Sequence, residues 1–82
     1  MENKEAWSLI EEATEGSSFR KREDALRKID LLAKQGKVPF QCMLLRDVLK
    51  KAGVRLTTTQ ERRIWIETTA KTYGFKIENL WF

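Results

Sequence analysis

The sequence predicts an all-α fold, a compact four-helix domain, and its four glycines are the main reason. Gly16, Gly36, Gly53 and Gly74 each follow a stretch in which apolar residues recur at helical spacing. Glycine is favoured just past a helix end because the residue there often adopts the left-handed conformation. Four such stops indicate four helices. A chain of 82 residues forms one domain at most.

The first two helices are expected over residues 3–14 and 18–35. Asn3 and Ser18 are the expected caps, because short polar side chains accept hydrogen bonds from the first free N–H groups of a helix. The apolar face of the first helix comprises Ala6, Leu9, Ile10 and Ala13, flanked by Trp7. The core stripe of the second helix comprises Ala25, Leu26, Ile29, Leu32 and Ala33.

The third and fourth helices are expected over residues 39–52 and 58–73. Pro39 is placed just inside the third helix, where its missing N–H is not needed. A capping box, Thr57 with Gln60 or Thr58 with Glu61, opens the fourth. The buried face of the third helix is expected to comprise Leu44, Leu45, Val48, Leu49 and Ala52. That of the fourth is expected to comprise Trp65, Ile66, Thr69, Ala70 and Tyr73.

Two stretches near the C-terminus leave alternatives open. Residues 64–69 are rich in β-branched side chains and suit a strand as well as a helix. The preceding cap and the Gly74 stop favour helix. Residues 75–82 alternate in part and predict a short extended tail. Its end, Leu80-Trp81-Phe82, is apolar, so it either packs on the domain or mediates dimerisation.

Composition indicates a binding protein of the cytoplasm, or of a host-cell cytosol. The single cysteine, Cys42, cannot form an internal disulfide, which is typical of reducing compartments. No apolar run approaches the roughly 20 residues of a membrane span, so no membrane partner is expected. Histidine is absent, which removes the commonest general base and metal ligand. We therefore expect no enzymatic activity, no metal and no cofactor.

Charge is divided unevenly along the chain. Residues 1–15 carry five acids and one base, a net −4, whereas residues 16–82 carry fifteen bases and seven acids, a net +8. A basic body suits an anionic partner, either a nucleic acid or an acidic protein face. Moderately basic small proteins are also common without any polyanion partner, so the charge alone does not decide between these interpretations.

The leading hypothesis is a regulatory or accessory factor that binds DNA in preference to RNA. The stretch from Leu44 to Ile66 resembles a helix-turn-helix, with Ala52-Gly53-Val54 at the turn. The turn is long, and Leu49 stands where that motif usually has a small residue. Thr58 and Gln60 are the candidate base readers. The candidate phosphate contacts are Arg20, Lys21, Arg22, Lys50, Lys51, Arg55, Arg62 and Arg63.

The alternative hypothesis is a protein-binding module, such as a small inhibitor, adaptor or assembly factor. Helical periodicity places several apolar side chains on the polar faces of their helices, away from the expected core. They would anchor a partner inside a ring of arginine and lysine. The candidate anchors are Leu31, Met43 and Ile64, together with Trp81 and Phe82 of the tail. Isolated exposed apolar residues are also normal on soluble proteins, and a central helix can bury two sides.

Overall fold

The computed structural model describes residues 4–54 and 56–77, and these residues form four helices and no strand. The all-α prediction is therefore confirmed, and residues 64–69 are helical. The helix-turn-helix detail is not confirmed. Each helix limit lies within one residue of its expected position. The helices are α1 (Lys4–Glu15), α2 (Phe19–Lys34), α3 (Phe40–Ala52) and α4 (Thr59–Tyr73).

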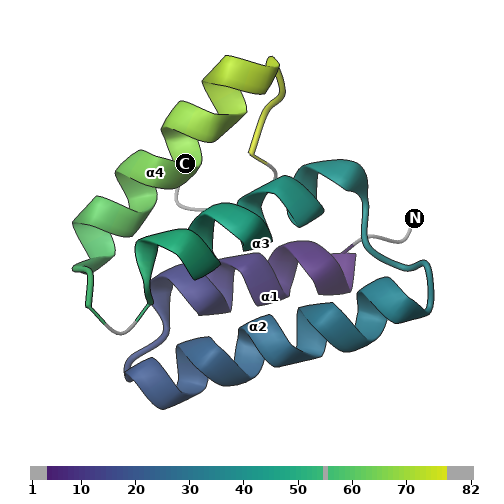
Figure 1. The fold of residues 1–82 in the computed structure, drawn as a ribbon, viewed down its shortest axis with the longest axis horizontal. Helices are drawn as coiled ribbons and strands as arrows, with labels where there is room; N and C mark the ends of the chain where they lie inside the picture. Colours follow the sequence, from purple (N-terminus) through teal and green to yellow (C-terminus); the bar gives the residue numbers. More distant parts are fainter. Residues whose placement is uncertain (1–3, 55, 78–82) are drawn as a thin grey trace.

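Helix α1 lies at the centre of the arrangement (Figure 1). It packs against α2, α3 and α4, whereas α2 and α4 do not pack against each other. Helices α1 and α2 run antiparallel, α3 crosses in front of α1, and α4 is inclined away from the other three (Figure 1). Because α4 touches only α3 and α1, a large part of its circumference has no helix to cover it.

The core forms where α1, α2 and α3 meet. Ile10, Ile29, Leu45 and Leu49 have no exposed surface, and Ile66 is the fully buried apolar residue of α4. Beyond α4, Phe75 and Ile77 are partly buried against this core. The start of the predicted tail therefore packs on the domain. Trp81 and Phe82 lie outside the described residues.

Helix α4 buries a narrower side than its sequence predicts. Its buried residues, Arg62, Ile66 and Ala70, follow each other at intervals of four and form a single stripe. Trp65 and Tyr73 were expected in the core, but 48% and 58% of their surfaces are exposed. The expectation was wrong for these two residues because they line an open groove beside α3 and do not pack into the core.

The helix ends follow the predicted capping chemistry in most cases. The Ser18 side chain accepts a hydrogen bond from the N–H of Lys21. Thr58 and Glu61 form the complete capping box of α4. Pro39 differs from expectation, because it occupies the cap position before α3 rather than the first turn. The expected cap Asn3 lies outside the described residues.

Gly16 is required for a different reason from the other three glycines. Gly36, Gly53 and Gly74 have φ between 72° and 82°, as the glycine-stop argument predicts. Gly16 is not among the glycines with positive φ. A Cβ atom there would lie 2.6 Å from the backbone oxygen of Glu12. Close packing, and not left-handed backbone, therefore explains the glycine at the end of α1.

Cys42 is a free cysteine buried in the core of the folded protein. The side chain is fully buried, and burial raises the pKa of the thiol to about 12. We expect iodoacetamide at pH 8 to leave the native protein unmodified and to alkylate the urea-unfolded protein completely. Above pH ~9 the unfolded thiol ionises and the folded one does not, so the free energy of unfolding should fall as pH rises. Equal alkylation rates with and without urea would contradict the burial.

Candidate functional site

Arg62, a candidate phosphate contact, is the largest fully buried side chain in the described part of the chain. Its Nε donates to the backbone oxygen of Thr14 at 2.9 Å, and its Nη1 donates to the backbone oxygen of Thr57. Its Nη2 donates to the hydroxyl of Thr59 at 3.0 Å. Burial lowers the pKa of Arg62, and nearby Arg22 acts in the same direction. The guanidinium is therefore structural and has no surface to offer a phosphate.

Arg22 of α2 also donates to backbone oxygens, one of them just after the end of α1. Its Nη1 donates to the backbone oxygen of Gly16 at 2.7 Å, and its Nε donates to that of Val54 at 2.9 Å. The last turn of α1 contains no basic residue of its own. Arg22 from α2 and Arg62 from α4 therefore supply the positive charge that suits the C-terminal end of a helix.

Two further candidate cations are paired with carboxylates. Arg63 donates through Nη2 to Glu15 Oε1 at 2.8 Å and through Nε to the other oxygen of that carboxylate. The hydrogen bond to Glu15 raises the pKa of Arg63. Lys50 contacts Asp30 at 2.9 Å, and Arg46 joins the same carboxylate at 3.0 Å. The ion pair between Arg63 and Glu15 links α4 to α1. The ion pairs with Asp30 link α3 to α2.

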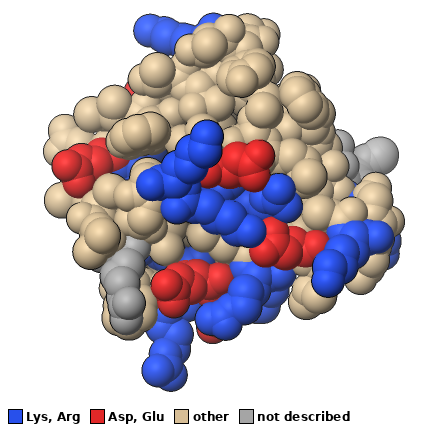
Figure 2. All heavy atoms as spheres, viewed as in Figure 1, with Lys and Arg blue, Asp and Glu red and all other residues tan. Residues whose placement is uncertain are grey.

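Four of the candidate cations are therefore engaged within the domain: Arg22 and Arg62 with backbone oxygens, and Lys50 and Arg63 with carboxylates. Arg20 and Lys21 on α2, and Lys51 on α3, are exposed. They have no ion-pair partner among the described residues. Figure 2 shows that the α2–α3 side carries acidic side chains between its basic ones. Thr58 is engaged in its cap, Gln60 is exposed, and Arg55 lies outside the described residues.

An apolar surface instead lies on α4, formed by Ile64, Trp65 and Tyr73. Their exposed fractions are 56%, 48% and 58%. Beside these residues runs a groove of about 460 Å³, bounded on the α3 side by Val48 and Lys51. On the α4 side its lining is completed by Thr68, Thr69 and Thr72. Figure 2 shows few charged side chains over α4 in this view.

Ile64 forms a ridge between two hollows. It lines the α3–α4 groove on one side. On the other side it lines a more polar depression of about 730 Å³, together with Gln60, Arg63 and Glu67. A partner surface can pack around an apolar side chain that projects between two open depressions.

The other apolar candidates do not join this surface. Leu31 is 58% exposed on α2, a helix that does not pack against α4. Met43 is half-buried on α3. Sequence reasoning identified Ile64 but missed Trp65 and Tyr73. The signal was the run Ile64-Trp65-Ile66, because three consecutive residues point about 100° apart and cannot all face one core.

No helix in the described ranges is long and apolar enough to cross a membrane. Comparison of the chain with protein-family models, with curated proteins and with solved structures found no match. Function must therefore be inferred from the chain's own geometry.

Proposed function

We propose that this chain is a non-enzymatic protein-binding module whose partner docks on the apolar surface formed by Ile64, Trp65 and Tyr73. The observation that carries the proposal is the exposure of these large side chains along one groove. Burying exposed apolar area gains free energy at roughly 25 cal/mol per Å², and aromatic anchors commonly dominate protein interfaces. Val48 and Lys51 provide the opposite wall of the groove.

The distribution of charge supports a protein partner over a polyanion. Binding to nucleic acid depends on cations that are free to neutralise phosphates. Arg22 and Arg62 donate to backbone oxygens, and Arg63 and Lys50 contact carboxylates. A recognition helix formed by α4 would also present the carboxylates of Glu61 and Glu67 to the DNA backbone.

The test is site-specific photocrosslinking in extract of the cells that make the protein. A benzophenone side chain at position 68 lies in the groove, and the same group at position 28 on α2 is the matched control. We expect a discrete protein adduct from position 68 that disappears with Ile64→Glu, and none from position 28. Equal adducts from both positions, or adducts from position 68 that persist with Ile64→Glu, would overturn the proposal.

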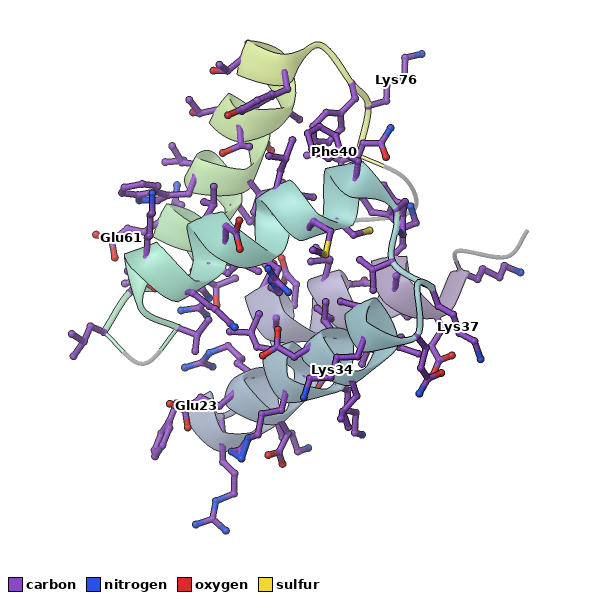
Figure 3. The ribbon with its side chains drawn as sticks, turned by 45° about the vertical axis from the view of Figure 1, so that its right-hand side comes forward. Glu23, Lys34, Lys37, Phe40, Glu61 and Lys76 are labelled. Atoms are coloured by element: carbon purple, nitrogen blue, oxygen red, sulfur yellow. The ribbon has the colours of Figure 1, made fainter. Side chains whose placement is uncertain are left out.

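A second candidate, nucleic-acid binding, is favoured by one observation. Arg20, Lys21, Lys28 and Lys34 are exposed on α2 and have no ion-pair partner among the described residues. Lys34 and Lys37 lie at one end of this helix, and Glu23 lies near the other (Figure 3). A duplex-DNA titration tests this role, because four neutralised phosphates give a log–log salt slope of about −3.6. A flat salt response would exclude it.

A further inference from the structure

We infer that the partner on this surface is a second copy of this chain, paired through an antiparallel contact between the two α4 helices. The inference rests on the proposed function, because it uses the same surface, and it adds the identity of the partner. A two-fold contact requires one patch that is complementary to itself, since every interaction occurs twice. The outward face of α4 meets this requirement in charge and in shape.

Two opposite charges lie at the two ends of this face, whereas Arg63 and Glu67 line the hollow beside its middle. Glu61 lies in the first turn of α4 and Lys71 in the last, and both side chains are exposed. Figure 3 shows Glu61 at the edge of the molecule, near the start of α4. One Glu61 oxygen accepts from the Thr58 N–H, which leaves the other oxygen able to accept from a partner. Lys71 has no ion-pair partner among the described residues.

An antiparallel pair places these opposite charges together. Position 66 is the midpoint of both the 61–71 and the 64–68 intervals, so one register aligns both sets of residues. Glu61 of each copy then lies opposite Lys71 of the other. The two helix dipoles are also oppositely directed in this arrangement, which is the favourable orientation. A parallel pair would instead place Glu61 beside Glu61 and Lys71 beside Lys71.

The shape of the face suits the same register. Ile64 projects as the ridge between the two hollows, and it would lie opposite Thr68 of the other copy. Thr68 and Thr72 are small and line the groove, so they permit the helices to approach closely. Trp65 lies beside this line and would lose exposed apolar surface on both copies. Each copy thus supplies both a projecting side chain and a place to receive it.

The experiment measures molar mass by sedimentation equilibrium from about 10 μM to about 1 mM, a range that covers weak association. Five samples are compared: the unmodified chain, Glu61→Lys, Lys71→Glu, an equal mixture of these two variants, and Lys28→Glu. Lys28→Glu on α2 is the matched charge control, and circular dichroism confirms that each variant is folded. Thermal melts are included because Glu61→Lys also removes half of the α4 capping box.

We expect the unmodified chain and Lys28→Glu to dimerise. Each α4 variant alone brings like charges together twice, so its dissociation constant should rise about tenfold or more. The mixture should recover dimers, because a heterodimer of the two variants again places a lysine opposite a glutamate at both contacts. Failure of the mixture to recover overturns the inference. An unmodified chain that is monomeric at the highest concentration also overturns it.

The photocrosslinking result separates this inference from the proposed function. An adduct from position 68 with twice the mass of the chain supports both. An adduct with a different protein, combined with monomeric chain, supports the protein-binding function and overturns self-association. Absence of any adduct dependent on Ile64, combined with a monomeric chain, overturns both the proposed function and self-association.

Discussion

Replacing Arg62 by methionine should lower the free energy of unfolding by about 3 kcal/mol. The change removes the donors to the backbone oxygens of Thr14 and Thr57. A buried acceptor left without a donor costs about 1–3 kcal/mol. Since 1 kcal/mol shifts the melting temperature of a domain this size by roughly 4–8 °C, the variant should melt about 12–24 °C lower.

The matched control for Arg62→Met is Arg27→Met. Arg27 makes an ion pair with Asp24 at 3.2 Å, and both side chains are more than half exposed. Such surface pairs contribute about 0–1 kcal/mol. Urea unfolding of both variants measures the difference. If Arg62→Met and Arg27→Met lose equal stability, the buried guanidinium does not hold the α1 and α4 ends together.

Replacing Gly16 by alanine should lower the free energy of unfolding by about 2 kcal/mol, because overpacking a tight site costs about 1–3 kcal/mol. The new Cβ would lie 2.6 Å from the Glu12 backbone oxygen and 3.0 Å from Arg22 Cγ. The first contact cannot relax without moving α1. The second would displace the arginine that donates to the Gly16 oxygen.

Ser17→Ala is the control for Gly16→Ala. Ser17 is the exposed next residue of the same linker, so its substitution should change stability by less than about 0.5 kcal/mol. Thermal unfolding followed by circular dichroism measures both. A Gly16→Ala variant as stable as Ser17→Ala would show that the chain relieves the contact without cost.

The helices were predictable because their signals are local. Ser18, the Thr58–Glu61 capping box and the glycines at 36, 53 and 74 lie within a few residues of the ends that they define. The reason for Gly16 was not predictable, since it depends on how closely Glu12 and Arg22 approach in space. Local chemistry therefore determined where the helices end, and tertiary packing determined what some of those ends contact.

The site was less predictable because it depends on the angle at which α4 joins the other helices. Arg62 looked like a surface cation, yet its partner Thr14 is 48 residues away in the chain. Glu15, the partner of Arg63, is equally distant. Trp65 looked like core because its spacing from Ala70 and Tyr73 suits a wide apolar face. Only the arrangement in space shows that this side of α4 borders an open groove beside α3.

The most direct test of the apolar surface on α4 is the free energy of unfolding of Ile64→Glu, measured in urea at a concentration at which the chain is monomeric. If Ile64 contacts a partner and does not pack in the core, the free energy of unfolding of Ile64→Glu should lie within about 0.5 kcal/mol of that of the unmodified chain. A loss of about 2 kcal/mol or more would show that Ile64 belongs to the core, contradicting the proposed binding surface.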